Sequence, residues 1–429
     1  MNPLFRNDKP GEYPPSWYAA TATPPPPRAP LTGAHKADVA ILGAGFTGLT
    51  CALHLARKGY KVAVIEAHRA GFGASGRNGG QCGSGYNLDQ ATLEKELGQT
   101  AACALWDLSM EAKAAVRDFC TAHAPEARFT PGVAHGAWGA SELRDIREDA
   151  EHLARHYDFQ TEYLQGDAFR EVVRSPVYHG GTIDRDAGHV HPLRYCLALA
   201  REAEKAGVTI YENSPVTRID GQTFHTDQGQ ITADHIVLAG NGYMPNIHPH
   251  YAARVCPINS FIAATAPVED PSTVLSQDIA VADDRFVVNY FRLSEDGRLL
   301  FGGRENYGIG FPADITTRLR QRMLQLFPQL EGVKFDYEWG GTLGITMRRV
   351  PLIEKLGPTT WAAGGFSGHG VALTAIAGRA LAEAIAGQAE RFDILSTLPT
   401  PPFPGGAHLR APLLTLAMTW YSLRDRLGI

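Results

Sequence analysis

The residues best suited to chemistry begin with three glycines, Gly43, Gly45 and Gly48, in the pattern G-x-G-x-x-G. Such glycines allow a tight turn, close approach of the backbone to a pyrophosphate, and close packing of a helix on a strand. Glu66 lies 23 residues after Gly43, where a carboxylate can accept hydrogen bonds from ribose hydroxyls. The pattern also occurs in turns that bind no ligand, so its meaning depends on the surrounding elements.

The elements around these glycines form a complete βαβ unit. Residues 38–42 (DVAIL) are typical of a strand, and apolar residues then follow at helical spacing between 49 and 56. A second apolar run, residues 61–65, ends just before Glu66. This order predicts a parallel sheet and a helix N-terminus that faces the phosphates of a dinucleotide. The glutamate also disfavours a 2′-phosphate, which argues against NADP.

Two more glycine-rich segments lie far apart in the chain. Residues 71–81 (GFGASGRNGGQ) hold five glycines in eleven residues, which suits close approach of the backbone to a planar group. Residues 364–370 (GGFSGHG) precede an apolar helix expected from Val371, so a second helix N-terminus would face an electron-rich group. Two such loops suit one elongated cofactor.

Composition excludes several classes of protein. The 429 residues are 44% hydrophobic and 20% charged with a formal net charge of -5, without the basic footprint of a nucleic-acid binder. No apolar run reaches the ~20 residues that span a bilayer, and no signal-peptide core is present. The six cysteines have neither disulfide nor metal-ligand spacing. We expect a cytoplasmic protein with no metal site, no transmembrane segment and no nucleic-acid partner; the oligomeric state is left open.

Several segments resemble the D-amino-acid oxidase-like FAD-dependent oxidoreductases. They are residues 38–81, VLAGNGY from Val237, YFRLSEDGRLLFGGR from Tyr290, WGGTLGITMRRVP from Trp339 and GFSGHGVALT from Gly365. Within that superfamily the chain is most similar to the gamma-glutamylputrescine oxidases. The resemblance implies FAD as cofactor and oxidation of a carbon–nitrogen bond by hydride transfer to flavin N5, followed by hydrolysis of the imine.

The resemblance also implies which residues bind FAD. The ADP half would be bound by Gly43, Gly45, Phe46, Thr47, Gly48, Glu66 and Ala67. The pyrophosphate and flavin edge would be bound by Ala74, Ser75, Gly76, Arg77, Asn78, Gly79, Gly80 and Gln81, and the adenine side by Val216. The remaining expected contacts are Gly240, Asn241, Gly242, Gly341, Gly365, Phe366, Ser367, Gly368, His369, Gly370 and Val371.

Five residues are candidates for substrate contact or catalysis. His369, between glycines, could contact the flavin and substrate or could satisfy a backbone carbonyl. Tyr290 and Arg292 share a face of a predicted strand, where they could supply an aromatic wall and a carboxylate-binding cation, or a solvated face. Trp339 could be a substrate wall or core packing. Arg349 is a weaker candidate for the cation.

Two departures from relatives bear on the cofactor. Monomeric sarcosine oxidases attach their flavin through a cysteine, whose nearest counterpart here is Gly341, so we expect noncovalent FAD. Those oxidases also activate oxygen with a lysine near N5, whereas the matching strand here reads Leu299-Leu300-Phe301. The electron acceptor could therefore be O2 or another molecule.

These observations predict an α/β (α+β two-domain) fold: a discontinuous Rossmann-like FAD-binding domain with an antiparallel-sheet substrate domain. The predicted boundaries are a Pro-rich N-terminal arm at 1–36, an FAD-binding domain at 37–98, 186–248 and 338–392, a substrate or cap domain at 99–185 and 249–337, and an amphipathic C-terminal helix tail at 393–429. The arm could be a strap on the surface or a flexible linker.

The leading functional hypothesis is an FAD-dependent amine oxidoreductase of polyamine catabolism. Its substrate would be gamma-glutamylputrescine or a similar carboxylate-bearing amine, and its products an aldehyde, ammonia and H2O2. The alternatives are an oxidase or dehydrogenase of glycine, sarcosine or D-amino acids, a membrane-docked flavin dehydrogenase that uses the terminal helix, and a protein with a structural flavin.

Overall fold

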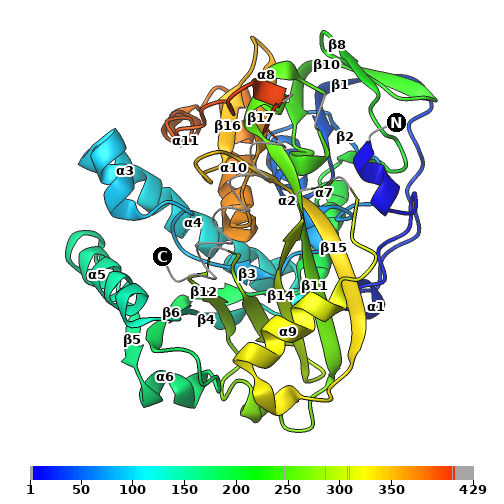
Figure 1. Cartoon of the computed structure of the whole chain (residues 1–429). Coiled ribbons are helices and arrows are strands. Elements are labelled where there is room, and N and C mark those ends of the chain that lie inside the picture. The colour runs from blue at the N-terminus through cyan, green and yellow to red at the C-terminus, as the bar shows by residue number, and fades with distance from the viewer. Residues whose placement is uncertain are drawn as a thin grey trace.

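A computed structural model describes residues 3–244, 247–285, 287–306, 308, 310–407 and 409–410. The amphipathic part of the predicted C-terminal tail, residues 411–429, lies outside the described residues. The described chain folds around two sheets, which Figure 1 shows one above the other. No helix within the described ranges is long and apolar enough to cross a membrane.

The first sheet contains the predicted βαβ unit. Its main strands, in spatial order, are β16 Leu352–Lys355, β17 Thr360–Gly364, β10 Gly229–Leu238, β1 Gly33–Leu42, β2 Val62–Ile65 and β7 Thr209–Tyr211. From β17 to β7 all neighbours are parallel, and β16 is antiparallel to β17. Two short strands, β8 Arg218–Asp220 and β9 Thr223–His225, extend the sheet beside β10. The predicted parallel sheet is therefore confirmed, and β1 begins at Gly33 rather than at residue 38.

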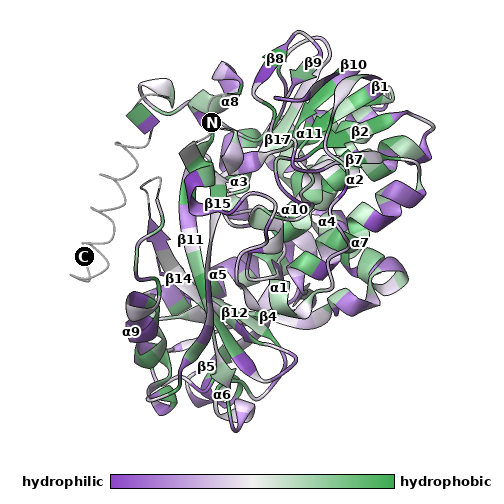
Figure 2. Cartoon of the chain, turned by 90° about the vertical axis from the view of Figure 1, so that its right-hand side faces the viewer, coloured by the Kyte–Doolittle hydropathy of each residue, from purple (hydrophilic) through white to green (hydrophobic). Residues whose placement is uncertain are grey.

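Alternating residues of the first sheet enter two different cores, as strand geometry requires. Val39 and Ile41 pack beneath helices, whereas Ala40 packs on the opposite face with Phe224 and Tyr251. The helices that share the first of these cores are α2 Phe46–Arg57, α3 Gln90–Leu97, α4 Gln99–His123, α7 Pro192–Lys205, α10 Gly370–Ile385 and α11 Glu390–Leu395. Figure 2 shows the first sheet as mostly green strands between helices that are purple on their outer sides.

The second sheet is larger and mixed. Its strands, in spatial order, are β15 Phe335–Ile345, β11 Cys256–Pro267, β14 Arg298–Asn306, β13 Tyr290–Leu293, β12 Ala280–Asp283, β4 Thr130–Ala137, β6 Gly180–His189 and β3 Gln81–Cys82, with β5 Glu162–Gln165 beside β6. All neighbours are antiparallel except β12 and β4, which run parallel. One face packs on α9 Thr316–Leu326, where Phe291 and Phe301 meet Leu319 and Met323.

Two elements lie elsewhere than their predicted domain. We expected α4 in the cap, but Leu105, Ala112 and Val116 of α4 belong to the core beneath the first sheet. We expected β15 in the FAD-binding domain, but it forms an edge of the second sheet beside β11. Helical periodicity shows that a helix has an apolar face but not which core receives that face. The helices that do lie beside the second sheet are α5 Ala140–Tyr157 and α6 Asp167–Val172, next to β4, β5 and β6 (Figure 1).

The N-terminal arm lies on the protein as a strap. After a 3-10 turn at Pro3–Asn7 and the short helix α1 Trp17–Thr21, the chain reaches β1 without further regular structure. Trp17 and Tyr18 of α1 are buried in a small core with Trp339. A flexible linker would not bury two large aromatic side chains, so the strap interpretation is confirmed.

Candidate functional site

One elongated cavity of about 1850 Å³ connects the predicted loops. It starts at the carboxyl ends of β1 and β10, whose last residues, Leu42 and Leu238, are register partners. It then passes the loop at 71–81 and reaches the N-terminus of α10. Ligands of open α/β sheets bind where the carboxyl ends of parallel strands meet. The cavity therefore lies where the first sheet predicts a ligand.

The first glycine turn fits this role by its geometry. Gly43 has φ +103°, and a Cβ there would lie 2.8 Å from the carbonyl oxygen of Ala239. A Cβ on Gly48 would lie 2.0 Å from the carbonyl oxygen of Gly43. Both positions therefore require glycine for the turn and for packing α2 on β1. Gly45, the N-cap of α2, lines the cavity together with Phe46.

Glu66 lies at the end of β2, and its carboxylate is held in place by the backbone. Its Oε2 accepts from Ala44 N at 2.8 Å, and its Oε1 accepts from His68 N at 3.0 Å. Burial raises the pKa of Glu66 from its ordinary value to about 7, and the two backbone donors offset part of that effect. A ligand hydroxyl that donates to this carboxylate would favour its ionised form.

The second glycine segment, residues 71–81, is held by Arg77. The guanidinium donates from Nε to Phe72 O at 2.6 Å and from Nη1 to Gly340 O at 3.0 Å. Asn78 further stabilises the loop, since its Oδ1 accepts from Gly80 N at 2.7 Å. These contacts hold one wall of the cavity against β15 of the second sheet.

The third glycine segment brings the N-terminus of α10 to the cavity. Asn241 joins it to the loop after β10, because its Oδ1 accepts from Gly365 N at 2.9 Å. His369 is the N-cap of α10, and a Cβ on Gly83 would lie 3.2 Å from its Cε1. Burial lowers the pKa of His369, so its imidazole is neutral near pH 7.

The second sheet contributes a polar wall opposite α10. Tyr290 Oη lies 3.2 Å from Ser260 Oγ, and both residues line the cavity. His135 on β4 is the register partner of Thr182 and Ala282, so it belongs to the same face. Its side chain is accessible within the cavity, and enclosure by the protein lowers its pKa. Two neutral imidazoles and two hydroxyls therefore converge here.

Beyond this wall the cavity continues between α3 and α5. Trp106 and Phe159 supply an aromatic surface at 5.1 Å between ring centroids. Carboxylates line the same part of the cavity, namely Asp89, Asp145, Glu148, Asp149 and Asp184. Arg349 also lines the cavity, and among the described lining residues no lysine is found. The carboxylates favour cationic groups, and the arginines among the described lining residues are Arg77, which holds the 71–81 segment, and Arg349.

Comparisons with known proteins agree with this geometry. The family described as FAD dependent oxidoreductase (DAO) matches residues 38–384. The chain is 41% identical over 416 residues to a probable oxidoreductase OrdL from Rhizobium meliloti, with 96% of this chain and 97% of that protein covered. It is 37% identical over 424 residues to the gamma-glutamylputrescine oxidoreductase of Escherichia coli, with 97% and 100% covered.

The fold has solved relatives as well. The crystal structure of glycine oxidase from Geobacillus kaustophilus matches with a TM-score of 0.69 at 20% identity, covering 82% of this chain and 95% of that one. The chain belongs to the DAO family of FAD-dependent oxidoreductases. The predicted enzyme class, cofactor and fold class are thereby confirmed.

The residues present fit the FAD of this family. The cavity is long enough to join the Gly43 turn, the Glu66 carboxylate and the N-terminus of α10 in one space. Two helix N-termini, those of α2 and α10, open on it and favour electron-rich groups. Gly341 lines the cavity, and no cysteine is found among its described lining residues. Noncovalent binding of FAD stays our prediction.

Most of the predicted cofactor residues line the cavity. They are Gly43, Gly45, Phe46, Thr47, Glu66, Ala67, Ala74, Ser75, Arg77, Asn78, Gly79, Gln81, Val216, Gly240, Asn241, Gly341, Phe366, Ser367, Gly368, His369, Gly370 and Val371. Five others lie behind its wall, namely Gly48, Gly76, Gly80, Gly242 and Gly365. At the first four of these five, a Cβ would come within 2.7 Å of backbone atoms. They shape the loops instead of lining the cavity.

Arg292 requires a correction, because its guanidinium does not line the main cavity. Its Nε donates to Gly79 O at 3.0 Å, and its Nη2 donates to Val190 O at 3.1 Å. The residue is only 5% exposed. Tyr290, two residues earlier, does line the cavity as predicted. Arg292 therefore supports the glycine segment from behind and is not placed to bind a substrate carboxylate.

Of the remaining predicted residues Trp339 and Arg349, the first is buried in the core and the second lines the cavity. Trp339 is 2% exposed, donates from Nε1 to Arg77 O at 2.9 Å, and packs edge-on against Tyr18. It belongs to the core, so the substrate-wall interpretation is wrong. Arg349 lines the cavity from a left-handed backbone conformation with φ +61°.

His135 and Phe5 are among the residues that line the cavity but were not predicted from the sequence, as are Trp106, Phe159 and Ser260. His135 lies in TPGVAHGA, a strand with weak hydrophobic alternation and no recognisable motif. Phe5 lies in the N-terminal arm, where nothing in the sequence indicates contact with a ligand site. Only the pairing of β4 within the second sheet and the path of the arm bring these side chains to the cavity.

Proposed function

We propose that this enzyme oxidises the terminal carbon–nitrogen bond of an amine that carries a distant carboxylate, with gamma-glutamylputrescine as its substrate. The products are the aldehyde, ammonia and, with O2 as the acceptor, H2O2: one amine, one O2 and one water are consumed. The observation that carries the proposal is the part of the cavity between α3 and α5 (the chamber), which is lined by aromatic rings and carboxylates, together with Arg349 in the lining of the same cavity. The similarity to the gamma-glutamylputrescine oxidoreductase supports the same choice.

The chamber suits a substrate with ammonium groups. Carboxylates such as Asp149 and Asp89 attract cations, and their proximity to each other contributes to the raised pKa of Asp149 after the larger effect of burial. Trp106 and Phe159 can pack on the methylene chain of a polyamine. Small amino acids such as glycine would leave most of these groups without a partner.

The chemistry that FAD would supply when bound is acceptance of the two electrons and the hydrogen removed from the carbon beside the nitrogen. The chain's own residues must hold that carbon in place and keep the amine uncharged. Enclosure lowers the pKa of both His135 and His369, so both imidazoles are neutral near pH 7 and each can accept a hydrogen bond from the substrate nitrogen. Tyr290, with Ser260, closes the wall beside them.

Arg349 is proposed to bind the distant carboxylate. A guanidinium can form two parallel hydrogen bonds to a carboxylate, which fixes the orientation of the substrate. Arg349 lines the cavity, and Arg292 does not line it.

A substrate comparison tests the proposal. We expect kcat/KM to be highest for gamma-glutamylputrescine when it is compared with putrescine, glycine, sarcosine and D-alanine. Assays under air with detection of H2O2, and under argon with an artificial acceptor, separate an oxidase from a dehydrogenase. A higher kcat/KM for glycine, sarcosine or D-alanine would overturn the choice of substrate.

A further inference from the structure

The N-terminal arm supplies part of the wall of the cofactor cavity. The family match begins at residue 38, yet Phe5, Pro10, Pro30 and Leu31 all line the cavity. We propose that residues 3–31 are a cofactor-binding strap, which contacts the FAD-binding loops and slows the release of FAD. The inference concerns FAD retention and is independent of which amine is oxidised.

The first contact of the strap is aromatic and lies beside Glu66. Phe5 packs edge-on against His68 at 4.8 Å and stacks with Tyr243 at 6.0 Å between ring centroids. His68 is the residue whose backbone N–H donates to Glu66. Its ring Nδ1 accepts from Gly11 N of the arm at 3.3 Å. The strap thus contacts the same residues that hold the Glu66 carboxylate in place.

The second contact is a buried ion pair with the second glycine segment. Asp8 Oδ1 lies 2.9 Å from Arg77 Nη1, and the two side chains are only 4% and 2% exposed. Burial raises the pKa of Asp8, and Arg77 offsets part of that effect. Arg77 itself lines the cavity and also donates to Phe72 O and Gly340 O. The position of this loop is therefore coupled to docking of the arm.

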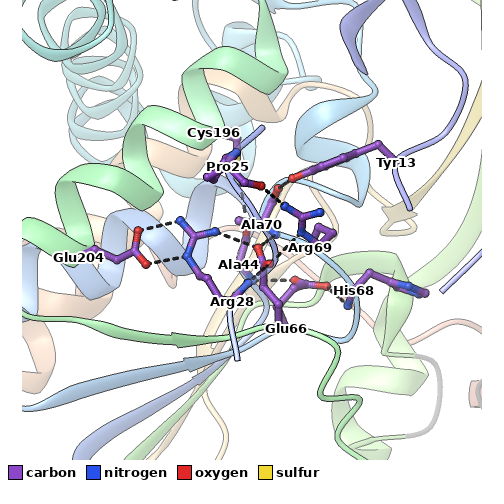
Figure 3. Close-up of polar contacts among 11 residues, drawn as sticks. Tyr13, Pro25, Arg28, Ala44, Glu66, His68, Arg69, Ala70, Cys196 and Glu204 are labelled. Carbon is purple, nitrogen blue, oxygen red and sulfur yellow. Dashed lines mark hydrogen bonds and ion pairs between the residues drawn. The ribbon is translucent and has the colours of Figure 1, made fainter. Parts of the chain in front are cut away.

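The third contact anchors the far end of the strap, as Figure 3 shows. Arg28 donates to the fully buried carboxylate of Glu212, from Nη1 at 2.9 Å and from its backbone N at 2.8 Å. Arg69 donates to the same carboxylate from Nε at 2.8 Å. Arg28 also forms two hydrogen bonds with Glu204. Since Arg69 follows Glu66 by three residues, this cluster joins the arm to the loop that bears the ribose-binding carboxylate.

These contacts predict mutual stabilisation of the strap and FAD. Phe5 near the start and Leu31 at the end of the arm both line the cavity, so FAD and the docked arm share that wall. A ligand that stabilises His68 and Arg77 in these positions favours docking of the arm, and by linkage the docked arm favours the bound ligand. FAD release then includes the loss of the strap contacts.

The test measures FAD release from three full-length variants. Phe5→Ala removes the aromatic wall and Asp8→Asn removes the charge that pairs with Arg77. Lys9→Ala is the matched control, because its side chain is 83% exposed. We expect the first two variants to release FAD about tenfold faster or more, followed by flavin fluorescence, and Lys9→Ala to match the wild type. Release rates within twofold of the wild type for both variants would overturn the proposal.

A second measurement uses the unmodified protein, in case a variant folds poorly. Amide hydrogen exchange of residues 3–31 is compared with and without FAD. We expect slower exchange when FAD is bound, with residues 316–326 of α9, which do not line the cavity, as an internal reference. Equal exchange of the arm in both states would overturn the linkage. Neither measurement involves an amine, so failure of the strap proposal is distinct from failure of the proposed function.

Discussion

At the scale of single residues, Glu66 shows how a buried carboxylate can report on cofactor binding. Burial raises its pKa from 4.5 to about 7, while Ala44 N and His68 N supply one donor to each oxygen. Because the pKa is raised in the folded protein, Glu66 stabilises the FAD-free fold fully below about pH 4.5. That contribution is lost as the pH rises through about 7.

Ribose hydroxyls should prefer the ionised carboxylate, which gives a prediction about pH. The affinity for FAD should increase as the pH is raised from 6 to 8, with a midpoint near the pKa of about 7. The measurement is the FAD dissociation constant across this range. Glu66→Gln should bind FAD more weakly and lose this pH dependence, and an unchanged pH profile in that variant would show that another group is responsible.

Arg292 provides a second prediction at this scale. In Arg292→Ala the carbonyls of Gly79 and Val190 lose their guanidinium donor, each at a cost of about 1–3 kcal/mol. We expect a lower free energy of unfolding and lower FAD occupancy, with KM for the amine nearly unchanged in the FAD-loaded fraction. A large increase in KM with an unchanged free energy of unfolding would instead show that Arg292 binds the substrate.

Arg349 and its neighbour Arg348 form a matched pair for testing the carboxylate anchor. Arg349→Ala should raise KM for gamma-glutamylputrescine by roughly 10- to 100-fold, corresponding to ~1.5–3 kcal/mol, and leave KM for putrescine nearly unchanged. Arg348 pairs with Glu96 and does not line the cavity, so Arg348→Ala should behave like the wild type. Equal increases for both substrates would assign Arg349 a structural role.

At the scale of elements, two glycines with different surroundings test whether close packing of α2 on β1 is needed for FAD binding. A Cβ on Gly48 would lie 2.0 Å from the carbonyl oxygen of Gly43, whereas a Cβ on Gly59 would meet no atom within 4 Å. We therefore expect Gly48→Ala to be isolated largely without FAD, because α2 is displaced from β1. Gly59→Ala, whose cost is limited to backbone strain at φ +90°, should retain FAD. The FAD-to-protein ratio after purification checks both expectations.

Secondary structure near the cofactor was predictable because local patterns determine it. The βαβ unit, the strand at Tyr290 and the helix after His369 are all confirmed. The parallel pairing of β12 with β4 and the packing of α4 were not predicted, since both depend on contacts distant in sequence. Strand alternation correctly placed Tyr290 and Arg292 on one face. The sequence does not indicate, however, that the side chain of Arg292 extends behind Gly79 and donates to its carbonyl.

At the scale of the whole molecule, the cavity belongs to both sheets and to the arm. The first sheet positions the Gly43 turn and Glu66, the second positions Tyr290 and His135, and the arm adds Phe5. Fold class and cofactor were predicted from the βαβ unit, from the two further glycine-rich segments and from the family resemblance. The lining of the chamber between α3 and α5 was not predicted, because it comes largely from helices whose sequences show only amphipathic spacing.

The most direct test of the central claim is a single turnover without oxygen. Enzyme holding stoichiometric FAD is mixed under argon with one equivalent of gamma-glutamylputrescine, and flavin colour, ammonia and aldehyde are measured together. We expect the yellow colour to bleach and about one ammonia and one aldehyde to form per FAD reduced. If enzyme with full FAD content stays yellow with this conjugate but bleaches with glycine or sarcosine, gamma-glutamylputrescine is not its substrate.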